Sequence, residues 1–164
     1  MGIAAADNID LADRLAVEFE HLYTQALLPG GDYAIRFSGV TGQQKQFIFE
    51  VPSSYFEPAQ RREFCLWLCR KEALVAYAYC EPRIFLKDDR LGTKGVLDII
   101  CASKRKDICR SVAIGPVNAT EPDAEKVSLW RDLLHSGARI ETELQIVYSN
   151  LWEKIRPKVL WRQR

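Results

Sequence analysis

The sequence VLDIICASKRKDICRSVAI (residues 96–114) holds two apolar segments separated by a short run of positive charge. Residues 96–102 and 108–114 have the length and the branched apolar content of β-strands. The residues between them, 103–107, are too few for the long crossover that joins parallel strands. The stretch therefore predicts an antiparallel hairpin whose solvated tip carries three cations, Lys104, Arg105 and Lys106.

Three further strands are expected before this hairpin. Apolar alternation over residues 33–38 and an apolar run at 46–51 predict a first pair. Their connection, residues 39–42, contains two glycines, which we expect to supply the positive φ of a tight turn. A strand over 74–80 follows, and we expect Pro82 to break it.

Four segments show the three- or four-residue apolar spacing of a helix face. They begin near residues 9, 58, 120 and 140, and the second opens on a proline, which suits a first helical turn. The expected buried face of the first is Leu11, Leu15, Phe19, Leu22 and Ala26, and that of the last is Ile140, Leu144, Val147, Leu151 and Ile155.

The order of elements is helix, two strands, helix, three strands, two helices. Because short loops pair neighbouring strands antiparallel, this order predicts an α+β domain. We expect an antiparallel sheet of about five strands with helices mainly on one face. The length and the 48% hydrophobic content suit a single domain over residues 1–164.

Composition excludes several classes of protein. A net charge of +1 with 27% charged residues argues against a disordered chain and a globally basic nucleic-acid binder. The N-terminus lacks the basic start of a secretory signal, and no apolar run approaches the roughly 20 residues that span a bilayer. We therefore expect a cytoplasmic protein that does not bind membranes. In a reducing compartment its cysteines should be free, buried thiols, at positions 65, 69, 80, 101 and 109.

No catalytic or metal-binding set converges in the sequence. Cys65 and Cys69 share a helix face, but a structural zinc site needs four ligands. The two histidines have no local ligand partner. Cys109 stands beside Arg110, yet no neighbouring base would activate it. We expect no cofactor and no metal, and we favour a protein without enzymatic activity.

Asp98 offers an enzymatic alternative. Together with Lys104 it resembles, over a short stretch, the core of a restriction-type nuclease, in which an Asp and a Glu-x-Lys triplet bind Mg²⁺. Ala102 stands where that triplet has its acid, so Glu81 or the acids at 88 and 89 would have to replace it. An exposed aspartate on an edge strand is the simpler interpretation, and we prefer it.

Charge is segregated along the chain. Up to residue 32 there are six acids and one base, whereas from residue 154 onward there are five bases and no acid. The basic C-terminal tail, residues 156–164, is expected either to be flexible or to pack against the acidic first helix. With Trp152 and Trp161 among its cations, this end of the chain suits single-stranded nucleic acid or an acidic protein groove equally well.

We therefore expect a small binding protein, acting as an adaptor, regulator or inhibitor through a protein–protein interface. A protein partner, of which a second copy of this chain is one example, is favoured over nucleic acid because the net charge is low. Any exposed tryptophan would mark the interface. The candidate binding residues are Lys104, Arg105, Lys106, Arg110, Trp152, Lys154, Arg156, Lys158, Trp161, Arg162 and Arg164.

Overall fold

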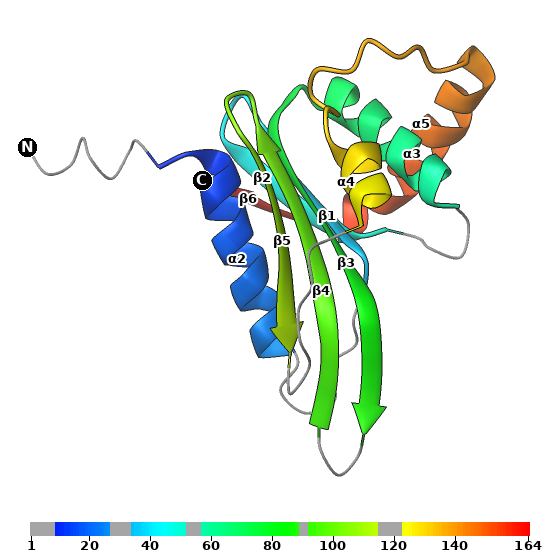
Figure 1. The fold of residues 1–164 in the computed structure, drawn as a ribbon. Helices are drawn as coiled ribbons and strands as arrows, with labels where there is room; N and C mark the ends of the chain where they lie inside the picture. The colour runs from blue at the N-terminus through cyan, green and yellow to red at the C-terminus, as the bar shows by residue number, and fades with distance from the viewer. Residues whose placement is uncertain (1–8, 27–33, 52–56, 89–91, 115–122) are drawn as a thin grey trace, which may run out of the picture.

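The chain folds as an α+β protein, as the sequence predicts (Figure 1). The computed structural model describes residues 9–26, 34–51, 57–88, 92–114 and 123–164. Its elements are α2 (Leu11–Ala26), β1 (Arg36–Thr41), β2 (Lys45–Glu50), α3 (Pro58–Lys71), β3 (Leu74–Asp88), β4 (Gly92–Ser103), β5 (Asp107–Ile114), α4 (Ala124–Trp130), α5 (Thr142–Ile155), η1 (Arg156–Lys158) and β6 (Leu160–Gln163).

The strands form one antiparallel sheet in the order β5-β4-β3-β1-β2-β6. The sheet has six described strands rather than five, because the C-terminal tail returns to pair β6 with β2. With the sequence LWRQ, this strand is too short to show an apolar alternation, so only its backbone pairing reveals it. The hairpin at residues 103–107 lies where the sequence places it, and β5 and β6 are the two edges.

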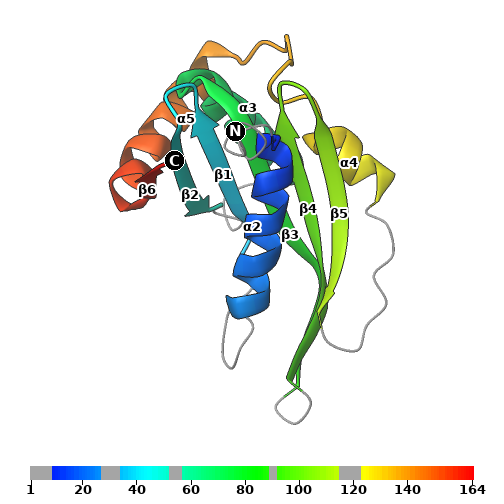
Figure 2. The same ribbon diagram turned by 90° about the vertical axis from the view of Figure 1, so that its left-hand side faces the viewer.

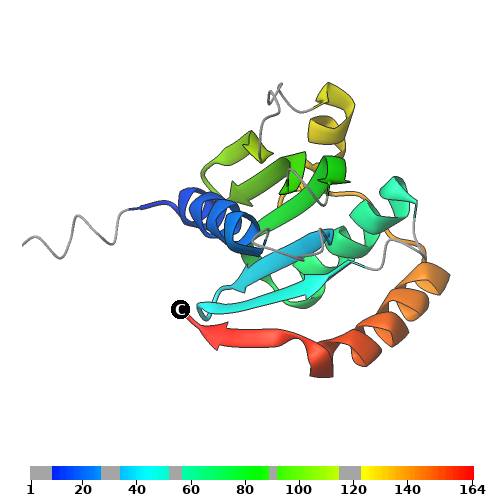
Figure 3. The same ribbon diagram turned by 90° about the horizontal axis from the view of Figure 1, so that it is seen from below.

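Helices cover both faces of the sheet. Helices α3, α4 and α5 lie on one face and α2 lies alone on the other (Figures 1 and 3). Figure 2 shows α2 in front of the sheet, with β2 and β6 to one side of it and β4 and β5 to the other. Each face has its own apolar core: Phe37, Phe47, Phe64, Trp130 and Trp152 belong to the first, and Leu15, Phe19, Val40, Ala78 and Ile99 to the second.

In two helices the buried stripe overlaps the predicted one but is rotated relative to it. In α2, Ala12 and Ala16 lie against the sheet with Leu15 and Phe19, and Leu22 is 37% exposed. Small alanines bring a helix backbone close to the strands, and this rotates the buried stripe. In α5 the most buried side chains are Tyr148 and Trp152. The predicted residues 144, 151 and 155 pack against the same core, whereas Val147 is 52% exposed.

The glycines of the first hairpin have a role other than the predicted one. Gly39 lies inside β1, where a Cβ would stand 2.6 Å from Leu74 Cδ1 and 2.7 Å from the ring of Phe47. Close packing against these side chains therefore requires a glycine there. The left-handed conformation of the turn falls on Gln44, with a φ of 63°.

Two boundaries also differ from prediction. Strand β3 continues past Pro82 through a register shift between Pro82 and Ile84, because a bulge tolerates a residue without an N–H. Helix α4 starts after Asp123, whose carboxylate accepts a hydrogen bond from the Glu125 amide, and the expected start at residue 120 lies outside the described residues. It ends at Trp130, shortly before Asp132 adopts a φ of 64°.

Candidate functional site

Four of the nine predicted basic residues form ion pairs with the acidic helix α2. Lys106 of the hairpin tip lies 2.9 Å from Asp13, and Arg110 of β5 lies 3.2 Å from Glu20. On the other side of α2, two arginines of the tail share Glu18, at 3.0 Å for Arg162 and 2.8 Å for Arg164. The tail therefore packs against the acidic first helix, which is one of the two arrangements that the sequence allows.

The tryptophans lie mainly in the core. Trp152 is 3% exposed and Trp130 is 1% exposed, so neither offers a surface to a partner. Trp161 is half-buried; its ring lies 5.0 Å from that of Phe47 and beneath the guanidinium of Arg156. The prediction that Trp152 binds a partner is therefore wrong, because its side chain is buried, and Trp161 packs against the core.

Four predicted cations remain exposed without an ion-pair partner in the described part of the chain. Lys104 and Arg105 are at the tip of the β4–β5 hairpin, and Lys154 and Lys158 are near the C-terminal end of α5. Because β5 and β6 are opposite edges of the sheet, these two pairs do not form one basic patch. Lys154 and Lys158 line a cavity.

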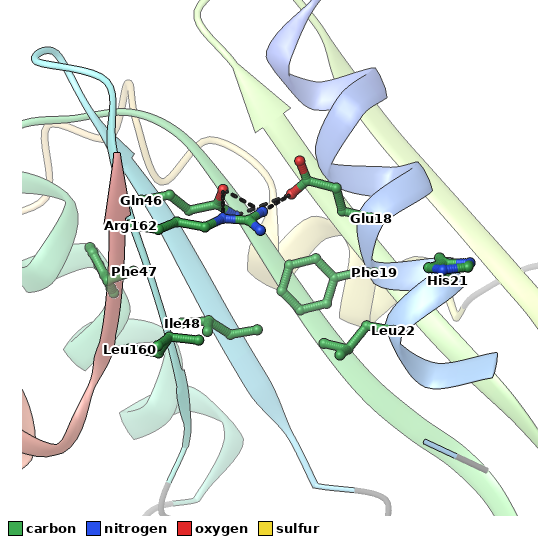
Figure 4. A pocket seen from close by; sticks show the side chains of 9 residues that line it. All are labelled: Glu18, Phe19, His21, Leu22, Gln46, Phe47, Ile48, Leu160 and Arg162. Carbon is green, nitrogen blue, oxygen red and sulfur yellow. Dashed lines mark hydrogen bonds and ion pairs between the residues drawn. The ribbon is translucent and has the colours of Figure 1, made fainter. Parts of the chain in front are cut away.

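The cavity lined by Lys154 and Lys158 adjoins a narrower slot beside α2. The slot, with a volume of about 300 Å³, lies between α2 and the β2–β6 edge of the sheet. Figure 4 shows apolar side chains on both of its sides and a polar bridge at one end, where Arg162 joins Glu18 to Gln46. The apolar lining residues are Phe19, Leu22, Phe47, Ile48 and Leu160.

A wider cavity of about 940 Å³ opens from the same apolar residues toward α5. Both cavities are lined by Leu22, Ile48 and Leu160, so they form one continuous groove. We call it the α2–β6 groove. The wide end adds three cations, Arg36, Lys154 and Lys158, together with Glu50.

The groove exposes large aliphatic side chains. Leu160 is 68% exposed and Leu22 is 37% exposed, on either side of the half-buried Ile48. Sequence reasoning missed all three, because Leu22 fits the predicted buried stripe and Leu160 lies among the charges of the tail. No local pattern signals a groove formed by a helix at one end of the chain and a strand at the other.

Asp98 occupies a different environment from the expected exposed edge. It lies on the inner strand β4, and it is 1% exposed. Its carboxylate accepts hydrogen bonds from Ser111 Oγ at 2.7 Å and Lys126 Nζ at 2.9 Å, and an ion pair with Arg83 measures 3.3 Å. A buried carboxylate with these partners anchors α4 to the sheet.

The fold does place Glu81 directly across from Asp98 on the neighbouring strand. Lys126 bridges both acids, and Arg61 lies 3.3 Å from Glu81. Burial lowers the pKa of Lys126, but its hydrogen bond to Asp98 and the two negative charges outweigh this effect and raise the pKa. An ammonium thus occupies the space that Mg²⁺ would need. Within the described residues, no group of three His, Cys, Asp or Glu side chains could hold a metal ion.

The cysteines are free thiols, as predicted. Cys65, Cys69, Cys80 and Cys101 are buried, and Cys109 is half-buried. Burial raises the pKa of the Cys109 thiol, and Arg131 opposes this shift only in part. Raised pKa values keep thiols protonated, so the described cysteines do not have the features of a nucleophile.

No described helix is both long enough and apolar enough to cross a bilayer. Comparison with known proteins identifies no relative: no family model, no curated protein and no solved structure matches the chain.

Proposed function

We propose that this chain is a non-enzymatic binding protein that holds a segment of another protein in the α2–β6 groove. The observation that carries the proposal is the pair of exposed leucines, Leu22 and Leu160, which line a continuous groove. Apolar side chains gathered in a concave surface with a charged rim are typical of sites that bind polypeptides. The five free cysteines support a reducing, cytoplasmic setting.

A protein partner has more support than a nucleic acid. Nucleic-acid binding requires solvated cations arranged along one surface. Here Lys106, Arg110, Arg162 and Arg164 are paired with acids of α2. The nuclease alternative has less support still, because Lys126 already neutralises the two acids that it would use.

The test is a change that adds charge to the groove without altering the fold. We expect Leu160→Asp to abolish recovery of partner proteins from a lysate treated with nuclease, because a carboxylate replaces an apolar contact worth about 2 kcal/mol or more. The matched control is Val17→Asp, since Val17 is 59% exposed on α2 and lines neither cavity.

Thermal unfolding of both variants separates loss of binding from loss of structure. Equal recovery of the same partners by wild type and Leu160→Asp would refute the proposal. Mixing tagged with untagged chain shows in the same experiment whether a second copy is the occupant: an untagged copy would then be retained by wild type and not by Leu160→Asp.

A further inference from the structure

We infer that the wide end of the α2–β6 groove is a carboxylate-binding subsite, in which Arg36, Lys154 and Lys158 recognise an acidic side chain of the bound segment. The inference rests on the proposed function, because the acid belongs to the same polypeptide that occupies the apolar slot. It adds the chemistry of the partner: an extended or helical segment with an Asp or Glu beside its apolar residues.

Arg36 is the centre of this subsite. Its guanidinium lies over the ring of Tyr23, 4.9 Å from the centroid, and its side chain is 18% exposed. Stacking on a ring holds a guanidinium in one orientation. Arg36 is therefore positioned before any ligand arrives.

The hydrogen bonding of Arg36 is incomplete. Its Nη1 is buried and has no acceptor among the described residues. Glu50 lies 3.8 Å from Nη2, which is longer than a hydrogen bond, and the Glu50 side chain is 70% exposed. The guanidinium thus has no close carboxylate among the described residues, and a carboxylate that contacts its accessible side from the groove gains a charge-assisted bond that the empty protein lacks.

Two lysines line the same cavity. Lys154 and Lys158 are exposed and have no ion-pair partner within the described residues. The described lining of the wide end thus holds three cations and one acid, and the acid is only loosely paired. The field at this end favours a negative charge on the ligand.

Apolar residues connect the charged end to the slot. Leu160 and Ile48 line both cavities, and Lys158 precedes Leu160 by two residues on the same segment. An apolar side chain of the partner on Leu160 therefore brings its neighbouring residues beside the cations. The geometry favours segments in which an aliphatic or aromatic residue is followed or preceded closely by an acid.

The test uses random peptides displayed on phage and fused to the coat protein through their C-termini, so that every carboxylate comes from a side chain. The full-length wild-type protein, Leu160→Asp, and the double variant Lys154→Gln/Lys158→Gln are each used as bait. Both lysines are exposed, so the double variant should fold normally. The matched control is Lys104→Gln/Arg105→Gln, which removes two equally exposed, unpaired cations at the hairpin tip.

We expect wild type and the control to enrich peptides that combine apolar residues with Asp or Glu. An enriched peptide is then synthesised with an amidated C-terminus. Replacing its acid by the matching amide should lower its affinity for wild type about tenfold. The unchanged peptide should bind the lysine double variant more weakly than wild type by a similar factor. In a double-mutant cycle the two losses should not add, because they remove the same contact.

Failure of the subsite and failure of the groove have different signatures. Two outcomes would overturn the carboxylate subsite and leave the proposed function standing. In the first, the enriched peptides need Leu160 but show no preference for acids. In the second, they bind the lysine double variant as tightly as wild type. Enrichment of nothing by wild type, or of peptides that bind Leu160→Asp equally well, would overturn the groove itself.

Discussion

Replacing Asp98 by asparagine tests whether the buried charge cluster is a structural anchor. The substitution keeps the shape of the side chain and removes its charge. Asp98 is 1% exposed and has contacts of 2.7 to 3.3 Å with Ser111, Lys126 and Arg83. Removing one partner of a buried ion pair costs about 3 to 5 kcal/mol. We expect about 3 kcal/mol, because Lys126 keeps Glu81 at 3.1 Å and Arg83 is partly solvated.

The assay is equilibrium unfolding in urea, with Lys126→Met as the second variant. The free energy of unfolding of the double variant should be close to that of the more destabilised single variant, since each removes the same pair. A loss below about 1 kcal/mol for Asp98→Asn would refute the anchoring role. Mg²⁺-dependent cleavage of nucleic acid by wild type that is lost in Asp98→Asn would revive the nuclease alternative.

Two further predictions concern the core. Gly39→Ala should destabilise the protein by about 1 to 3 kcal/mol in the same urea assay, because the added Cβ overlaps packed side chains. Gly42→Ala is the control: its added Cβ would have its nearest contact at 3.9 Å, so it should change stability by less than about 0.5 kcal/mol. The free energy of unfolding should also fall above about pH 9. Burial raises the pKa of the Cys80 and Cys101 thiols in the folded protein. Above the ordinary thiol pKa of 9.0 the unfolded chain therefore binds fewer protons than the folded chain, and a rise in pH favours unfolding. Once the unfolded thiol is ionised, each buried thiol should lower the free energy of unfolding by about 1.4 kcal/mol per pH unit. Cys80→Ala should make the plot of this free energy against pH less steep by that amount. An unchanged steepness would contradict the role given to Cys80.

The fold class was accessible from sequence because it depends on local signals. Each of these signals depends on nearby residues alone: the period-two and helical spacings, the proline that opens α3 and the short turn at residues 103–107. The buried faces of α2 and α5 were not accessible in the same way. Their rotation depends on whether Ala12 meets the sheet and whether Tyr148 meets Phe64 of α3, and this is set by the packing of elements that are distant in sequence.

The candidate site was less predictable than the fold. Segregated charge correctly indicated that the acidic N-terminal helix and the basic tail could satisfy each other, since Arg162 and Arg164 of the tail both bind Glu18. The pairing of Lys106 and Arg110 with the same helix was not predicted. Arg36 and Leu160 carried no signal, since a lone arginine in a strand and a leucine in a basic tail are both ordinary. Lys154 and Lys158 were chosen from composition, but their role in the groove follows from their neighbours in space.

By itself, then, the sequence determined the four α-helices, five of the six described strands, their antiparallel pairing and the free thiols, because these follow from nearest-neighbour sterics and hydrophobic burial. The tertiary structure alone decided that the C-terminal tail closes the sheet as β6, beside β2, and that α2 covers only part of the opposite face. The α2–β6 groove arises from that incomplete cover. Such a surface depends on the relative placement of distant residues, such as Leu22 and Leu160, which are 138 positions apart, and no local preference encodes it.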